Sequence, residues 1–253
     1  MATATLARLV LLEARRGGLP WLAAASLLLS VALAAFLSQV AVTESVALQL
    51  AVVGAALRAC SVFLIATHVA ASTAREISDK GLELMLALPL SRTEHYLGRL
   101  AGFAACGVAL AVVFALPLAL WAPAVKVLAW GISLAVETAL VAAIALFFAM
   151  TLGQLVPALA ATAGMYVLAR NMPTIQLIST GPLAEESQLQ VAARWLVDGV
   201  AFLLPPVDAM TRTAWLLYEP PGVRAYAAAL GGAAVYGIVV AAAGLFDFHR
   251  RSV

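Results

Sequence analysis

Two ionisable residues stand near the middle of long apolar segments, where they could hold helices together or line a polar path. Arg58 lies in the apolar segment at about 46–72, and Glu137 lies in the one at about 126–151. A charge at the centre of a bilayer costs about 2.5–3.5 kcal/mol on insertion scales, so such residues normally face a bundle interior or a polar cavity. Three interpretations stay open: a mutual ion pair, two groups that line a translocation path, or separate partners and snorkelling for each residue.

The motifs of common catalytic and cofactor sites do not occur in the sequence. There is no Gly-x-x-x-x-Gly-Lys-[Ser/Thr] phosphate loop, and the only lysines are Lys80 and Lys126. No Gly-x-Ser-x-Gly nucleophile elbow is found. The histidines have no Cys, Asp or Glu at metal-ligand spacing; they are His68, His95 and His249. We therefore expect no enzyme activity, no cofactor and no metal site in this chain.

A polar-rich stretch over 75–92 interrupts the first two thirds of the chain. Its charges gather at the two ends, alternate leucines run from Leu82 to Leu88 between them, and Pro89 closes the run. The stretch is too polar to cross a bilayer and too apolar for a flexible linker. We expect a short helix at the membrane surface that a soluble partner binds.

The composition predicts an all-α polytopic membrane protein. Of the 253 residues, 64% are hydrophobic and only 11% are charged, whereas an ordinary soluble domain is about 25% charged. The mean hydropathy is +1.01. Cys60 and Cys106 both fall in apolar spans, where cysteine behaves as a small hydrophobic residue, and we expect no disulfide.

The apolar segments divide the chain into six spans of the length that a bilayer demands, within a single transmembrane domain over 1–253. An amphipathic interfacial helix over 2–17 precedes them and ends at Gly17-Gly18. The loop 75–92 separates the second and third spans, and the segment 173–224 separates the fifth and sixth. The spans are expected at about 20–42, 46–72, 97–121, 126–151, 155–172 and 225–248.

Basic residues are distributed unequally between the two sides of this topology, and this bias predicts the orientation. One side holds both termini and the loop 75–92, with Arg8, Arg15, Arg16, Arg75, Lys80, Arg92, Arg99, Arg250 and Arg251. The other side holds Lys126, Arg170, Arg194, Arg212 and Arg224, mostly in a long segment that the rule weights less. We therefore expect both termini and the loop 75–92 in the cytoplasm.

The segment 173–224 is extracytoplasmic in this topology. Residues 191–204 predict a helix that ends at Pro205-Pro206. At about 14 residues it is too short to span a bilayer. Residues 208–218 predict a second short helix. Proline and glycine on either side of short helices favour re-entrant or interfacial structure, which is tolerated at membrane depth only against protein or a watery cavity.

The loop 75–92 resembles the first cytoplasmic loop of ABC-2-type transporter permeases. In that family the loop sequence begins with glutamate and a few polar residues, continues with Gly-Thr-Leu-Glu and an apolar run, and ends with Pro-x-Ser-Arg. The corresponding residues here are Arg75-Glu76 and Leu82-Glu83-Leu84-Met85-Leu86-Ala87-Leu88-Pro89-Leu90-Ser91-Arg92. Lys80 and Gly81 stand at the family's Gly and Thr, so the glycine is shifted by one residue.

A second match lies before the last span and is similar to the family's Asn-Pro-x-Asp-x-x-Arg segment. It reads Leu204-Pro205-Pro206-Val207-Asp208-Ala209-Met210-Thr211-Arg212, with Pro205 in place of the asparagine. The resemblance implies an extracytoplasmic re-entrant motif formed by Pro206, Asp208 and Arg212. Within the family, the chain is similar to the permease of nitrous oxide reductase maturation systems.

The resemblance implies a homodimer of permeases in the bacterial inner membrane, joined by two cytoplasmic ATPase subunits that bind the ATP and Mg. Leu84, Met85 and Leu88 would be buried in a groove of the ATPase, and Arg75, Glu76, Glu83 and Arg92 would orient the contact. ATP-driven closure would move the second and third spans and export a substrate. The residues implied in coupling are Arg75, Glu76, Lys80, Gly81, Leu82, Glu83, Leu84, Met85, Leu88, Pro89, Ser91 and Arg92.

Two other functions stay open. One is an ABC-2-like subunit that transmits force to a periplasmic protein without bulk transport. The other is a membrane enzyme or scaffold that works without an ATPase. Membrane lipids are the remaining partners that we expect, and we expect no binding of nucleic acid. The Ala/Leu/Val-rich spans indicate an apolar or amphipathic cargo, or a narrow path.

Overall fold

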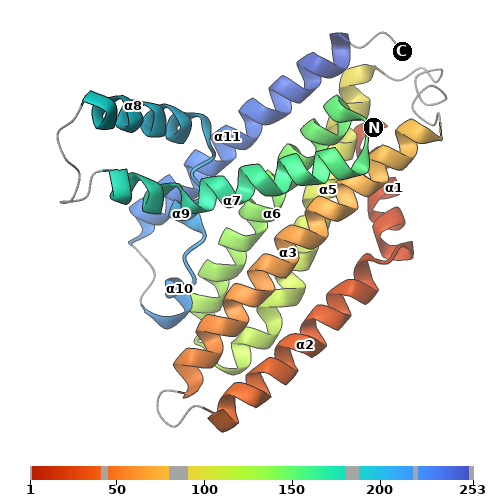
Figure 1. Ribbon diagram of the computed structural model, residues 1–253. Coiled ribbons are helices and arrows are strands. Elements are labelled where there is room, and N and C mark those ends of the chain that lie inside the picture. The colour runs from red at the N-terminus through yellow and green to blue at the C-terminus, as the bar shows by residue number, and fades with distance from the viewer. Residues whose placement is uncertain (1, 41–44, 80–90, 180–187, 219–221, 251–253) are drawn as a thin grey trace.

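A computed structural model describes residues 2–40, 45–79, 91–179, 188–218 and 222–250, which form helices joined by short connections (Figure 1). The expected all-α class is confirmed for these residues. In chain order the helices are α1 Ala2–Arg16, α2 Leu19–Val40, α3 Ser45–Ser78, α5 Arg92–Ala115, the 3-10 helix η1 Leu116–Leu120, α6 Ala124–Leu152, α7 Leu155–Ser179, α8 Gln188–Leu203, α9 Val207–Met210, α10 Ala214–Leu217 and α11 Val223–Arg250.

Five of these helices are long and apolar enough to cross a membrane. They cover Leu19–Gln39, Val46–Ser78, Arg92–Leu120, Ala124–Leu152 and Val223–Arg250. The helix α7 is also 25 residues long, but its second half carries Arg170, Asn171 and Gln176, and its crossing of the membrane stays a prediction. Five long apolar helices indicate a membrane-embedded protein.

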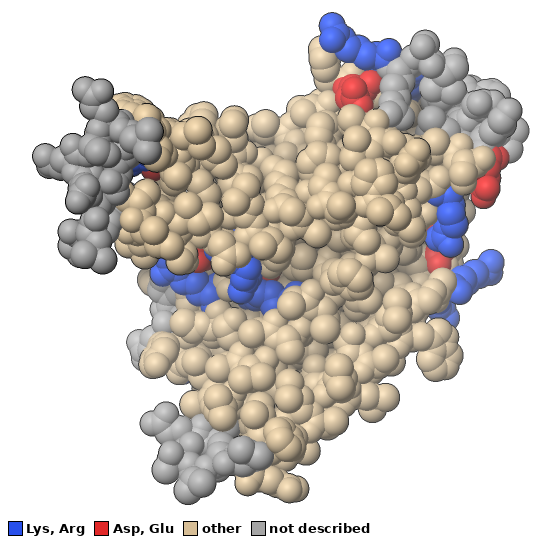
Figure 2. Space-filling model, viewed as in Figure 1, with Lys and Arg blue, Asp and Glu red and all other residues tan. Residues whose placement is uncertain are grey.

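The outer surface suits a lipid environment. On α2, large apolar side chains such as Trp21, Leu28 and Phe36 are more than half exposed, an arrangement that lipid tails accommodate and water does not. In Figure 2 charged side chains are sparse on this face and gather at its upper right, beside the chain ends, and in a band below α7.

The helix α6 lies at the centre and packs against α3, α5, α7 and α11. Its inward side chains, among them Trp130, Leu134 and Leu146, are fully buried. It ends at Leu152, and the next residue, Gly153, caps it with a φ of 69°, in the left-handed region that favours glycine after a helix.

The helix α11 runs parallel to α6. At one end the Tyr226 hydroxyl donates to the Ala129 carbonyl at 2.6 Å, and at the other the Thr151 hydroxyl donates to Asp247 Oδ2 at 3.0 Å. The chain between α6 and α11 therefore returns to the opposite end of the bundle, through α7 to α10. Both termini lie at the end where α3 finishes and α5 begins (Figure 1).

Two helices extend beyond the expected membrane spans, and one expected helix is divided in two. The helix α3 continues to Ser78, beyond the expected end of the second span at about 72, and Glu76 in its last turns pairs with Arg99 of α5. The helix α7 continues past Met172, the expected end of the fifth span, with Pro173 inside it, although an internal proline costs roughly 3 kcal/mol. It packs on α8 and α9. The single helix expected at 208–218 is two one-turn helices, α9 and α10, separated at the buried Thr211.

Candidate functional site: a central polar cluster and a loop clasp

The two ionisable residues of the apolar spans form an ion pair. Arg58 of α3 pairs through Nη1 with Glu137 Oε2 of α6, and the two side chains are 1% and 0% exposed. Arg58 Nη2 also donates to Ser133 Oγ at 2.9 Å, and its guanidinium lies 5.1 Å from the centre of the Trp130 ring. Of the three interpretations drawn from the sequence, the structure therefore shows the mutual pair.

The same carboxylate also binds α7. The Tyr166 hydroxyl donates to Glu137 Oε1 at 2.6 Å, and Arg170 Nη1 donates to the Tyr166 hydroxyl at 3.1 Å. Arg170 Nη1 lies 3.9 Å from Glu137 Oε1. We call Arg58, Ser133, Glu137, Tyr166 and Arg170 the central polar cluster.

The cluster joins three helices around one carboxylate. Spacings of four residues, Ser133 to Glu137 and Tyr166 to Arg170, place each pair on one face of its helix. Sequence reasoning missed Tyr166 and Ser133 and counted Arg170 only as a basic residue of the far side. The signal that could have found the pair on α7 is the four-residue spacing of Tyr166 and Arg170 in an apolar segment.

The cluster carries an excess positive charge at its outer edge. Two guanidinium groups share one carboxylate, and the Arg170 side chain is 35% exposed whereas Glu137 is fully buried. Buried charges are stable only when paired and hydrogen-bonded. The cluster can therefore lock α3, α6 and α7 together, and it presents a positive group where the Arg170 side chain is exposed.

A second polar cluster connects the two helices that flank the segment 80–90. Glu76, in the last turns of α3, pairs through Oε2 with Arg99 Nη1 of α5. Its other oxygen lies 3.5 Å from His95 Nε2. Glu76, His95 and Arg99 are 13%, 2% and 7% exposed. We call these three residues the loop clasp.

The loop clasp is linked to the N-terminal helix. Arg99 Nη2 donates to Ser72 Oγ at 3.2 Å, and the Ser72 hydroxyl lies 2.9 Å and 3.0 Å from the two carboxylate oxygens of Glu13 on α1. Arg75 Nη2 also reaches Glu13 Oε1, at 3.4 Å, on the exposed side. A chain of polar contacts thus joins α1, α3 and α5 beside the loop.

The start of α5 is fixed to the last helix. Ser91 is its N-cap and forms a capping box with Glu94, which satisfies free backbone donors of the first turn. Arg92 Nη1 donates to the carbonyl oxygens of Phe248 at 3.3 Å and His249 at 3.2 Å, at the end of α11. The segment 80–90 is therefore flanked by helix ends that contact α1 and α11.

The residues expected to couple to an ATPase divide into two groups. Arg75, Glu76, Ser91 and Arg92 belong to α3, the N-cap and α5, and the carboxylate of Glu76 is turned into the protein. The expected role of Arg75, Glu76 and Arg92 in orienting an ATPase stays a prediction, and the structure shows their partners within the chain. Outside the described residues lie Lys80, Gly81, Leu82, Glu83, Leu84, Met85, Leu88 and Pro89.

The second expected motif forms a turn and a short helix. Pro206 precedes α9, and Arg212 Nη2 lies 3.6 Å from Asp208 Oδ2, an exposed pair four residues apart. The neighbouring Val207 and Met210 are buried against α6, α7 and α11. The segment is therefore packed on the bundle, and its re-entrant role stays a prediction.

Comparison of the chain with models of known protein families and with curated proteins finds no match. Among the residues that the structure describes, no three His, Cys, Asp or Glu side chains gather as metal ligands would. The two clusters and the order of the helices are the features of the molecule that bear on its function.

Proposed function

We propose that the chain is the membrane-spanning permease subunit of an ABC transporter, which exports its substrate with ATP hydrolysed by a separate ATPase docked on 75–92. The observation that carries the proposal is the loop clasp. A loop that only connects two spans needs no fixed ends. A loop that transmits a conformational change must have its ends rigidly attached to the helices that move.

In the proposed mechanism the ATPase displaces the loop, and the loop clasp transmits this displacement to α3 and α5. Leu84, Met85 and Leu88 are buried in the ATPase, and Glu83 orients the contact. Glu76 pairs inward with Arg99 and passes displacement of α3 directly to α5, because a buried ion pair tolerates little change in its geometry. Their motion reaches α1 through the Ser72–Glu13 contact.

The substrate path in this proposal passes beside the central polar cluster, in a homodimer of six-span subunits. The parallel course of α6 and α11 supports a sixth crossing, because the chain between them must return to the other end of the bundle. The helix α7 is the element of suitable length for that crossing. The Glu137 contacts would then couple α7 to α3 when the path opens.

The helix α8 favours a second candidate function, the transmission of force to an extracytoplasmic partner. It packs on α7 and exposes Trp195, Phe202 and Leu203, which are 76%, 88% and 70% exposed. Asp198 Oδ1 accepts from Gln176 Nε2 of α7 at 3.1 Å. Motion of α7 would therefore reach α8.

Co-purification tests the proposal. The full chain is isolated from its native membranes by mild detergent, and the bound ATPase and its ATP hydrolysis are measured for the natural sequence, Leu84→Asp and Glu83→Arg. We expect both variants to lose the ATPase, with Leu128→Ala, on a lipid-exposed face of α6, as the matched control. ATPase retained at natural levels by both variants would contradict docking on this loop.

A further inference from the structure

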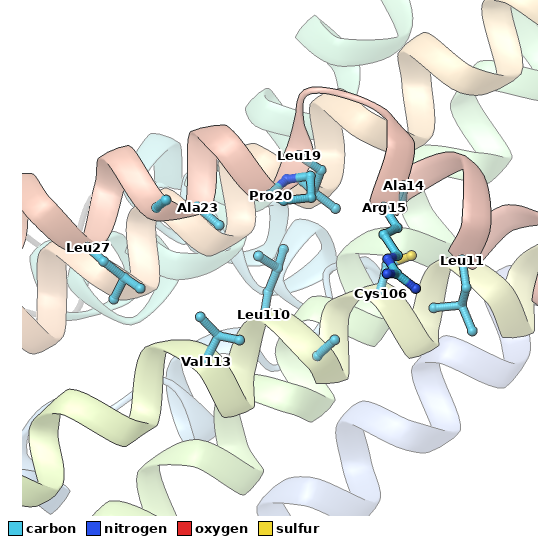
Figure 3. Close-up of a pocket in the computed structure, with 12 residues that line it drawn as sticks. Leu11, Ala14, Arg15, Leu19, Pro20, Ala23, Leu27, Cys106, Leu110 and Val113 are labelled. Atoms are coloured by element: carbon cyan, nitrogen blue, oxygen red, sulfur yellow. The ribbon is translucent and has the colours of Figure 1, made fainter.

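A groove between α1, α2 and α5 contains one charged side chain among apolar walls (Figure 3). The cavity measures about 470 Å³, within the range of small-molecule sites. Arg15 reaches from α1 toward Cys106 of α5 at one end, and Leu27 and Val113 lie at the other end. The groove therefore has a basic end beside the α1–α2 turn and an apolar end deeper among the spans.

Arg15 has no acidic partner among the described side chains. Glu13, two residues earlier on α1, is turned to the other side, where it contacts Ser72 and Arg75 of α3. A guanidinium at a membrane boundary is stabilised by a phosphate, which it binds through two parallel hydrogen bonds. The apolar walls below it suit an acyl chain.

We propose that this groove binds an anionic phospholipid, with the phosphate on Arg15 and one acyl chain along Ala23, Leu110 and Val113. The site is separate from the loop clasp and does not depend on an ATPase. Its occupant lies on the side of the α1–α2 turn, beside Arg15 and Cys106.

A second groove provides an internal comparison. It lies between α5, η1 and α6, measures about 450 Å³ and is lined by apolar residues such as Val112, Leu116, Leu128 and Ile132. Its volume and its walls match those of the first groove, but it is lined by no charged residue. Both grooves can hold lipid tails, and only the groove at Arg15 should select the headgroup.

Native mass spectrometry of the purified full chain in detergent tests the proposal. The chain is offered an equimolar mixture of phosphatidylglycerol and phosphatidylcholine with identical acyl chains. We expect the phosphatidylglycerol adduct to exceed the phosphatidylcholine adduct on the order of fivefold, the effect of one arginine beside a headgroup with a net negative charge. Phosphatidylcholine has no net charge, because its choline group neutralises the phosphate. Arg15→Gln should abolish the preference, and Arg16→Gln, next to it but outside the groove lining, should keep it.

Filling the grooves supplies the second measurement. Ala109→Trp, which blocks the groove at Arg15, should remove the selective adduct, and Ala119→Trp, in the uncharged groove, should leave the preference unchanged. Equal losses in Arg15→Gln and Arg16→Gln would overturn the proposal in favour of general attraction to α1. A preference that survives Ala109→Trp would also overturn the proposal, as would the absence of a preference in the natural chain. The same holds if Arg15→Gln removes a dimer of the chain and leaves the bound lipid unchanged.

Discussion

Glu137 is the residue on which the packing of three helices converges, because its two oxygens bind Arg58 of α3 and Tyr166 of α7. Removing one member of a buried pair leaves an unpaired charge, which costs about 3–5 kcal/mol. Exchanging the charges keeps the pair in a less favourable geometry. The contribution of the pair can therefore be separated from that of either residue alone.

We expect Arg58→Glu to lower the free energy of unfolding by about 3 kcal/mol or more, because two carboxylates then meet in the core. Adding Glu137→Arg should restore part of the stability. The measurement is thermal unfolding in detergent with the folded yield as a second readout. A double variant no better than the single one would contradict a direct pair.

Tyr166→Phe should cost about 1–3 kcal/mol, because Glu137 Oε1 loses its short hydrogen bond in the core and Arg170 loses the hydroxyl that it contacts. The same unfolding measurement applies. Tyr218→Phe, at an exposed tyrosine, is the matched control and should change the free energy of unfolding by less than about 0.5 kcal/mol. Equal effects of the two substitutions would mean that the contact on α7 does not stabilise the fold.

At the scale of elements, α1 is seated directly on two glycines of α5. A Cβ added at Gly98 would lie 2.8 Å from Leu6 Cβ, and one added at Gly102 would lie 2.6 Å from Val10 Cβ. Backbones approach this closely only where side chains are absent, as in other small-residue helix contacts in membranes. The two glycines, four residues apart, lie on one face of α5.

Gly102→Leu should therefore displace α1, with loss of the Glu13–Ser72 contact. Trypsin cleavage at the arginines of α1 in detergent measures the displacement, and we expect it to rise at least several-fold. Gly164→Leu on α7, where an added Cβ meets no atom within 4 Å, is the matched control. Unchanged cleavage in Gly102→Leu would contradict this seating.

Hydropathy predicted most of the elements, because length and apolar content define a span without any knowledge of its neighbours. Hydropathy could not show that α3 continues to Ser78 or that Glu76 in its last turns pairs with Arg99 and His95, because these partners are distant in sequence. It missed Tyr166 for the same reason. The Arg58–Glu137 pair could be anticipated because charges in apolar spans have few partners to choose from.

At the scale of the whole molecule, both termini and the flanks of the loop 80–90 share one end of the bundle. Five crossings would place the termini on opposite sides of the membrane, whereas the six crossings that we propose would place both termini on one side. Single cysteines in a Cys60→Ser, Cys106→Ser background test this proposal. We expect an impermeant maleimide to label Ser78→Cys from the cytoplasmic side and Tyr218→Cys from the other side.

Labelling of both positions from one side would contradict the six-span topology. Ser78 and Tyr218 suit the test because both side chains are exposed. Ser78 is the last residue of α3, and Tyr218 lies beside the start of α6, at the opposite end of the bundle. The predicted orientation itself depends on the excess of basic residues at the chain ends.

The central claim is that the loop 75–92 docks a soluble ATPase. The most direct test replaces Leu84 with a photo-crosslinking amino acid in intact cells and identifies the trapped protein by mass spectrometry. We predict one major adduct with a protein that carries a Gly-x-x-x-x-Gly-Lys-[Ser/Thr] phosphate loop, and no such adduct from the same amino acid at Leu128. Adducts at Leu84 with lipid alone, or with proteins that lack a nucleotide site, would contradict the account.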